Sequence, residues 1–317
     1  MVALNVIGFY NGLNEQARGY TYLRRYGSLL DYLAVFQIGI RENGSLSGAL
    51  SQNLVRDAHA MGIKVLLVFS NLNIQGQFST PLMTRMIREP QFADLVWQNI
   101  RDYVVSHQCD GVNLDLERAR PEDRTLFSRF VNNWGERFQR QNLFVSMDVP
   151  AKFKDEPAKA WTGPFDYHSI SQNLDAIVLM TYEEHWPGSS PGSVASLGWV
   201  TRVLDYALAN MPANKIYMGL PLYGYDWTEG GGAQVISRRR ALEVAQRFGA
   251  TSRWDDDQHS TYFTYENRGR RHTVYFEDPR STREKLDLAR RKGIRGVAIW
   301  EMNLSYPEFW EVLREYV

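Results

Sequence analysis

Eight short apolar runs, separated by segments with helical spacing, constrain what this chain can fold into. The runs are rich in β-branched residues, so we expect them to form β-strands. In the first half of the chain their starts lie about 30 residues apart, the length of one strand, one crossover helix and two short loops. Eight such units close a parallel (β/α)8 barrel, the TIM barrel of the α/β class. The predicted strands cover residues 3–10, 33–40, 64–70, 111–117, 143–149, 175–182, 215–222 and 295–301.

Helical spacing is clearest in four of the intervening segments, and glycine follows the apolar pattern of two of them. Gly62 and Gly293 stand where a left-handed glycine commonly ends a helix. The predicted helices cover residues 51–62, 90–107, 121–141 and 282–293.

The interval between the last two predicted strands is much longer than the others. Within it, residues 253–278 alternate polar and apolar side chains around the turn sequence ENRGR, which indicates an antiparallel hairpin. We therefore expect a small α+β insertion at about residues 223–280, on the rim of the barrel between strands 7 and 8. No low-complexity linker divides the chain, so we expect one catalytic barrel over residues 1–317.

Composition excludes several classes of function. The 36 basic and 36 acidic residues give no net charge, so no basic field favours nucleic acid or an anionic membrane. No apolar run reaches the roughly 18 residues that cross a bilayer. The single cysteine, Cys109, excludes an intramolecular disulfide and a cysteine-based zinc site, and we expect it to be a small buried residue. The six histidines show no HxxxH spacing, so we expect no metal and no cofactor. No signal peptide is visible at the start of the chain.

The segment DGVNLDLE, Asp110 to Glu117, is the most informative stretch for function. A strand of a parallel barrel is usually continuously apolar, whereas this strand alternates, with Asn113, Asp115 and Glu117 on one face. Side chains two residues apart lie roughly 6 to 7 Å apart along a strand. An amide and two carboxylates thus follow one another on one face of the strand, towards the carboxyl end of the barrel, where barrel enzymes carry their active sites.

Two carboxylates inside a barrel disfavour each other's ionisation, so one of them should have a raised pKa and hold a proton near neutral pH. Such a group is a general acid. Glu117, at the end of the strand, is best placed to reach a substrate, and Asp115 below it can share its charge. The alternative is that these carboxylates pair with an internal Arg or Lys.

This strand resembles the DGxDxDxE signature of family 18 glycoside hydrolases, the chitinases and endo-N-acetylglucosaminidases, whose fold is the same barrel. Asp110, Asp115 and Glu117 match its first Asp, last Asp and catalytic Glu. Asn113 stands where most chitinases carry another Asp, which leaves Asp115 without the carboxylate that usually shares its proton.

Other segments agree in the same order along the chain. MTYEEHW, from Met180, resembles the MxYD element, with Tyr182 on the Tyr and Glu183 replacing the Asp. GVAIWEMN resembles the last strand and places Trp300 on the Trp that floors the central sugar subsite. The third strand departs from the family pattern, with SNLN at residues 70–73 where SxGG is usual. The resemblance is closest to the spore-cortex branch, whose members often carry LysM wall-binding modules; none is visible here.

The resemblance implies a retaining mechanism without an enzyme nucleophile, in which the substrate's own 2-acetamido carbonyl attacks the anomeric carbon. Glu117 is then the acid and the subsequent base, Asp115 orients the acetamido nitrogen, and Tyr182 donates to the acetamido oxygen. Asn113 would support Asp115 from below. Aromatic side chains near the strand ends can stack on sugar rings or belong to the ordinary core. The expected substrate contacts are Trp300, Tyr10, Met180, Glu183, Tyr223 and Trp186.

Three functions remain open from the sequence. The first is an N-acetylglucosaminidase that acts on peptidoglycan of the spore cortex or its fragments, and the second is a chitinase. The third is an inactive glycan-binding protein, which the substitutions at Asn113 and Glu183 allow but the retained Glu117 argues against. We expect a monomer with a peptidoglycan or chitin-like partner, and the resemblance implies a spore-associated or extracellular, cell-wall location.

Overall fold

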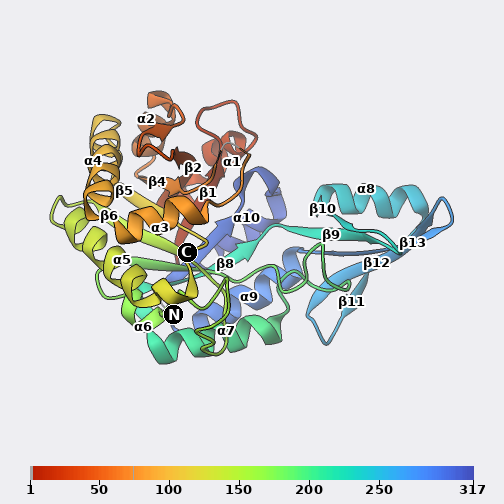
Figure 1. Ribbon diagram of the computed structural model, residues 1–317. Helices are drawn as coiled ribbons and strands as arrows, with labels where there is room; N and C mark the ends of the chain where they lie inside the picture. Colours follow the sequence, from red (N-terminus) through yellow and green to blue (C-terminus); the bar gives the residue numbers. More distant parts are fainter. Residues whose placement is uncertain (1–2, 74) are drawn as a thin grey trace.

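The computed structural model describes residues 3–73 and 75–317, and within them eight parallel strands close a barrel (Figure 1). The strand order is β1-β14-β8-β7-β6-β5-β4-β2, and pairing of β1 with β2 closes the ring. The expected TIM barrel is confirmed. Its strands are β1 (Asn5–Asn11), β2 (Tyr32–Ile40), β4 (Lys64–Ser70), β5 (Gly111–Asp115), β6 (Phe144–Pro150), β7 (Ala176–Met180), β8 (Ile216–Pro221) and β14 (Gly296–Trp300), and the short β3 (Leu46–Ser47) pairs antiparallel with β2.

Two strands that carry expected site residues end earlier than the sequence predicts. β5 ends at Asp115 and β7 ends at Met180, so Glu117 and Tyr182 lie on the loops that follow. Loops at the carboxyl ends of the strands form the active-site face of such a barrel. Both side chains therefore lie at the mouth of the barrel.

Helices surround the barrel, and the four predicted helical segments are all found. Gly62 and Gly293 have positive φ values of 78° and 63°, in agreement with their expected place after a helix. The segment predicted at 121–141 begins with a 3-10 turn, Pro121–Asp123, before the α-helix starts. The helices are α1 (Gly19–Tyr26), α2 (Gln52–Ala60), α3 (Thr80–Arg88), α4 (Pro90–Ser106), α5 (Arg124–Gln139), α6 (Tyr167–Ile170), α7 (Leu197–Asn210), α9 (Pro279–Lys292) and α10 (Pro307–Arg314), and further 3-10 turns lie at Gly27–Leu29, Ala213–Lys215 and Met302–Leu304.

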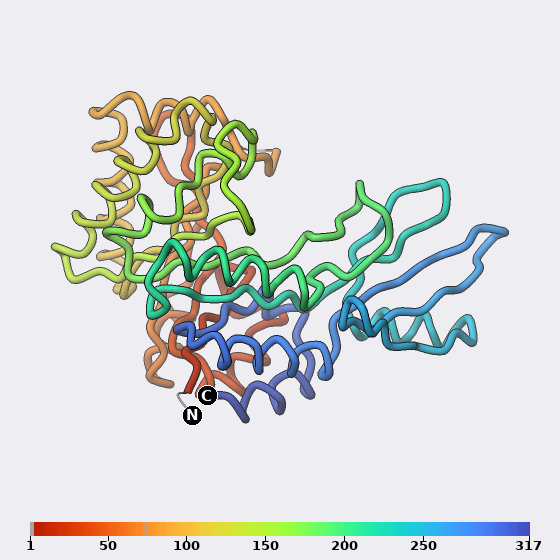
Figure 2. The backbone as a smooth tube through the Cα atoms, turned by 90° about the horizontal axis from the view of Figure 1, so that it is seen from below, coloured from red at the N-terminus to blue at the C-terminus, as the bar shows by residue number. Residues whose placement is uncertain are grey.

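The expected insertion between the seventh and eighth barrel strands forms a second, antiparallel sheet. It projects from the barrel in both views, and α8 covers one of its faces (Figures 1 and 2). Its strand order is β10-β9-β13-β12-β11. The elements are β9 (Tyr223–Thr228), β10 (Ala233–Ser237), α8 (Arg238–Phe248), β11 (Arg253–Asp255), β12 (Ser260–Asn267) and β13 (Arg270–Phe276).

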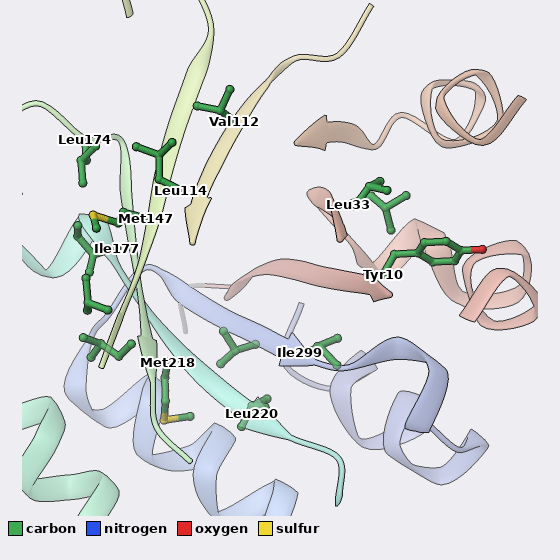
Figure 3. Packing of buried hydrophobic residues seen from close by; sticks show 14 of the residues in the cluster. Tyr10, Leu33, Val112, Leu114, Met147, Leu174, Ile177, Met218, Leu220 and Ile299 are labelled. Atoms are coloured by element: carbon green, nitrogen blue, oxygen red, sulfur yellow. The ribbon is translucent and has the colours of Figure 1, made fainter. Parts of the chain in front are cut away.

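Apolar residues of the strands alternate between two buried layers. One layer lies between the strands and the helices and includes Val112 and Leu114 of β5 (Figure 3). The other fills the barrel interior and includes Ile7 and Phe9 of β1. This alternation follows from the two-residue period of a strand, and it leaves the polar side chains of β5 inside the barrel.

The two ends of the described chain lie side by side, where the backbone N–H of Leu4 donates to the carbonyl of Tyr316 at 2.9 Å (Figure 2). Cys109 is buried in the outer layer, as expected. Among the described residues, no helix is both long and apolar enough to pass through a lipid bilayer.

Candidate active site

A cavity of about 310 Å³ opens at the carboxyl ends of the barrel strands. Most of the residues expected at the site line it, together with several that the sequence did not suggest. In the part of the chain that the structure describes, no Lys, Arg or His lines this cavity, so the alternative of an internal ion pair finds no partner there. The lining residues are Phe36, Leu72, Gly76, Phe78, Asp115, Glu117, Asp148, Trp161, Met180, Tyr182, Glu183, Tyr223 and Trp300.

Glu117 is held in place through its backbone, which leaves its carboxylate to face the cavity. Its N–H donates to Oδ1 of Asn71 at 3.0 Å, and its carbonyl accepts from Nδ2 of Asn71 at 2.9 Å. Burial raises the pKa of Glu117, against the opposing effects of a hydrogen bond from Trp161 and the charge of Arg118. A carboxyl with a raised pKa can carry a proton to a leaving group near neutral pH.

Asp115 is the last residue of β5, two residues before Glu117, and is 6% exposed. Burial, and then the negative charges of Asp148 and Glu117, raise its pKa well above the usual range. Asp115 therefore holds a proton when the neighbouring carboxylates are ionised, which is the behaviour expected of buried carboxylates in one cavity.

Asp148 on β6 is the main site residue that the sequence reasoning missed. The expectation that Asp115 has no carboxylate partner is wrong, because Asp148 stands beside it on the next strand and influences its ionisation. Nδ2 of Asn113 donates to Oδ1 of Asp148 at 3.0 Å and to Oγ of Ser146 at 3.1 Å. Burial raises the pKa of Asp148 to about 7, despite this hydrogen bond. The sequence signal was present, since Ser146 and Asp148 alternate with apolar residues just as the polar residues of β5 do.

Trp300, the last residue of β14, forms an aromatic wall with its neighbours. Its ring meets Phe36 edge to face, with centroids 5.2 Å apart, and lies nearly parallel to Tyr182, with centroids 6.5 Å apart. Burial, together with the surrounding carboxylates, raises the pKa of Tyr182 well above the usual range. A phenol with a raised pKa keeps its proton through the neutral range, so the hydroxyl of Tyr182 can donate a hydrogen bond there.

Glu183 is fixed by the insertion. Its carboxylate accepts hydrogen bonds from the hydroxyls of Tyr223 and Tyr225, the latter at 2.7 and 2.9 Å. Both tyrosines come from β9, so the inserted sheet builds one wall of the cavity. Met180 lines the cavity at the end of β7. The glutamate's backbone has a positive φ of 66°, a strained conformation that the surrounding contacts must maintain.

Two expected substrate contacts, Tyr10 and Trp186, do not lie at the cavity, and the expectation is corrected for both. Tyr10 is fully buried on the helix-facing side of β1, where its hydroxyl donates to the carbonyl of Asn14 at 2.6 Å (Figure 3). Trp186 is 52% exposed on its loop, and its ring packs over Gly188. Position near a strand end suggested both residues. Tyr10 instead faces the helices, and Trp186 is not among the described residues that line the cavity.

Trp161 was also missed, because it lies on the irregular loop after β6, where no sequence period indicates which way a side chain points. Its indole Nε1 donates to Oε2 of Glu117 at 3.1 Å. It is 40% exposed and forms part of the cavity rim.

Comparison with known proteins agrees with this arrangement. The sequence model of the glycosyl hydrolases family 18 matches residues 6–304. A cortical fragment-lytic enzyme of Bacillus subtilis is 31% identical over 298 residues, which cover 92% of this chain and 69% of that protein. The crystal structure of the Bacillus cereus spore cortex-lytic enzyme SleL superposes with a TM-score of 0.91 at 27% identity, covering 99% of this chain and 74% of that one. A chitinase from Chromobacterium violaceum gives a TM-score of 0.91 at 26% identity, covering 99% and 98%.

The family match spans nearly the whole barrel, and Glu117 and Asp115 line one cavity at the mouth of the barrel. The chain belongs to the glycosyl hydrolases family 18 and is a glycosidase.

Proposed function

We propose that this glycosidase cleaves β-1,4 bonds after N-acetylglucosamine in peptidoglycan of the spore cortex or its fragments, with retention of configuration. The observation that carries the proposal is the arrangement of Glu117, Asp115 and Tyr182 around one cavity with Trp300 in its wall. These groups supply an acid, an acceptor for an amide N–H, a donor for an oxygen and an apolar surface for a sugar ring.

In the first step the 2-acetamido carbonyl oxygen of the substrate bonds to the anomeric carbon, while Glu117 gives its proton to the departing glycosidic oxygen. Glu117 then takes a proton from water, and that water opens the cyclic intermediate. The raised pKa of Glu117 suits it for the acid step. Because the nucleophile belongs to the substrate, the reaction requires an N-acetylated sugar.

Asp115 and Tyr182 act on the acetamido group itself. An ionised Asp115 accepts the acetamido N–H and balances the positive charge that develops on the cyclised group. The hydroxyl of Tyr182, which stays protonated, donates to the acetamido oxygen. Trp300 supports the sugar ring from one side, next to Phe36.

Names of relatives support the cortex as the substrate. The relative from Bacillus subtilis is named a cortical fragment-lytic enzyme, and the structure from Bacillus cereus is that of a spore cortex-lytic enzyme. A second candidate, cleavage of chitin, is favoured by the equal TM-score of the Chromobacterium violaceum chitinase. The inactive, glycan-binding alternative is less well supported, because Glu117 lines the cavity and burial raises its pKa, as a general acid requires.

We also propose that the protein works as a monomer at the spore or cell wall. The described residues of one copy supply the proposed acid, the carboxylates beside it and the aromatic wall, which supports the monomer. The proposed location follows from the descriptions of the relatives.

Mass spectrometry of products tests the proposal. The protein and its Glu117→Gln variant are incubated separately with spore-cortex fragments and with chitooligosaccharides. Cortex fragments that end in reducing N-acetylglucosamine, made only by the parent protein, support the proposal. Products from chitooligosaccharides alone make the enzyme a chitinase, and no product from either substrate favours the glycan-binding function.

A further inference from the structure

Asp115 and Asp148 occupy matched positions on adjacent strands, with both side chains in the barrel interior. In the parallel register, Asn113 lies opposite Ser146 and Leu114 lies opposite Met147, so the next residues along the two strands are Asp115 and Asp148. Adjacent strands are about 4.8 Å apart, and side chains at matched positions point the same way. Asp115 and Asp148 therefore stand side by side on the wall of the cavity, which both of them line.

The Asn113 amide faces this pair from below and fixes the orientation of one member. Its Nδ2 donates to Oδ1 of Asp148, and an amide nitrogen can only donate a hydrogen bond. Oδ1 of Asp148 is thus held as an acceptor, while its second oxygen is left for other partners. Asn113 itself cannot take up a proton, so the only carboxylate beside Asp115 at this depth, among the described residues that line the cavity, is Asp148.

The remaining titratable groups around this pair are acids or phenols. Glu117 lies above Asp115 on the same side of the cavity, and Tyr182 and Glu183 face it from the loop after β7. No cation of the described chain lines the cavity to balance two ionised aspartates. Two buried carboxylates side by side without a cation share one proton.

We propose that Asp148 is a positioning residue that shares a single proton with Asp115. The Asp148 carboxylate on β6 thus supplies the proton-sharing partner that the Asn113 amide on β5 cannot be. The proposal rests on the proposed function, because it concerns how Asp115 becomes able to accept the acetamido N–H of the substrate.

The proton transfer is balanced within the pair. In the free enzyme above about pH 7 a single proton remains on the pair and resides on Asp115, and the hydrogen bond from Asn113 stabilises the ionised form of Asp148. When the acetamido N–H of a substrate approaches Asp115, the proton passes from the oxygen of Asp115 to the free oxygen of Asp148. The pair carries one negative charge before and after the transfer, and Asp115 becomes the anionic acceptor that the substrate needs.

A purely structural role for Asp148, as an anchor for Asn113, is the competing explanation. The Asp148→Asn variant separates the two, because its amide oxygen can still accept from Asn113 while it cannot accept a proton. The double variant Asn113→Asp/Asp148→Asn exchanges the carboxylate and the amide between the strands. Asp226→Asn is a matched control, because Asp226 lies in the inserted sheet, where it accepts from Tyr265 and His272.

Two measurements are made on these variants and the parent protein. The first is the pH profile of kcat and KM on a soluble chitooligosaccharide. The second is a ¹³C NMR titration of protein labelled at the aspartate carboxyl carbons, with the Asp115 signal assigned from Asp115→Asn. The titration needs no turnover, so it decides the proposal even if the proposed function fails and the parent protein cleaves nothing.

We expect Asp148→Asn to lower kcat about tenfold or more with little change in KM, because Asp115 loses the group that takes its proton. The pKa of Asp115 should also fall, because a neighbouring negative charge is removed. The double variant should regain most of the lost kcat and restore a shared proton, while Asp226→Asn should match the parent. An Asp115 titration and a pH profile that are unchanged in Asp148→Asn would overturn the proposal. A double variant that restores neither the kcat nor the coupled titration would overturn it as well.

Discussion

Nε1 of Trp161 donates a hydrogen bond to Oε2 of Glu117 across 3.1 Å, from a loop to the carboxylate expected to act as the acid. Donation to a carboxylate favours its ionised form. The hydrogen bond therefore lowers the pKa of Glu117 against the larger effect of burial, which raises it. Trp161 thus tunes the pH at which Glu117 loses its proton.

Removal of this hydrogen bond should extend activity to higher pH. In Trp161→Phe the pKa of Glu117 rises, so the alkaline limb of the kcat/KM profile moves to higher pH. The measurement is the pH dependence of cleavage of a soluble oligosaccharide. Trp186→Phe, on a loop outside the cavity, is the control and should keep the parent's profile. An alkaline limb at the same pH as in the parent would show that Trp161 does not affect the pKa of Glu117.

Loss of the Trp300 ring should weaken sugar binding more than it affects folding. The Trp300→Ala variant removes the surface that packs against Phe36 and Tyr182, and kcat/KM should fall by about tenfold or more. Trp300→Phe keeps an aromatic face and should retain most of the activity. Steady-state kinetics with thermal unfolding of each variant checks this, and equal losses in both variants would contradict a stacking role.

Buried carboxylates at the site should make the protein less stable at alkaline pH. The pKa of Asp148 is raised from 3.8 to about 7 in the folded protein. A group with a raised folded-state pKa gives stability that is complete below its unfolded pKa and is lost as the pH rises through its folded pKa. Replacing Asp148 by Asn removes this loss, so the variant should be more stable than the parent above pH 7 and should lose that advantage as the pH falls towards 4.

The expected gain at pH 8 is on the order of 1 to 3 kcal/mol, because about 1.4 kcal/mol accompanies each unit of pKa shift and the neighbouring carboxylates share part of it. Urea unfolding of the parent and Asp148→Asn at pH 5 and pH 8 measures the difference. If Asp148→Asn gained more free energy of unfolding over the parent at pH 5 than at pH 8, the prediction would be wrong.

A methyl group at Gly111 should separate β5 from β6. A Cβ at this position would lie 2.1 Å from the carbonyl oxygen of Phe144, which is backbone of β6 and cannot move aside. Gly111→Ala should therefore lose several kcal/mol of stability, about 2 to 4, and most of its activity. Gly198→Ala, at a helix position with open space around it, should unfold like the parent in the same thermal assay. A normal melting temperature for Gly111→Ala would contradict this account.

The sequence predicted those features that depend on periods along the chain. The eight strands, the insertion and the inward face of Asn113, Asp115 and Glu117 all follow from the spacing of apolar and polar residues, because a strand repeats every two residues wherever it is packed. The same period would have placed Tyr10 correctly, since Ile7 and Phe9 face the barrel interior and Tyr10 therefore faces the helices.

Only the tertiary structure decided which residues meet across strands and loops. The order of the strands puts Asp148 beside Asp115, although the two are far apart in the sequence, and the loop after β6 brings Trp161 to Glu117. Contacts between strands depend on register and barrel closure, and contacts from loops depend on backbone conformations without a period. The chain by itself therefore determined the barrel and its carboxylate strand, and folding determined the electrostatic surroundings that set how those carboxylates hold their protons.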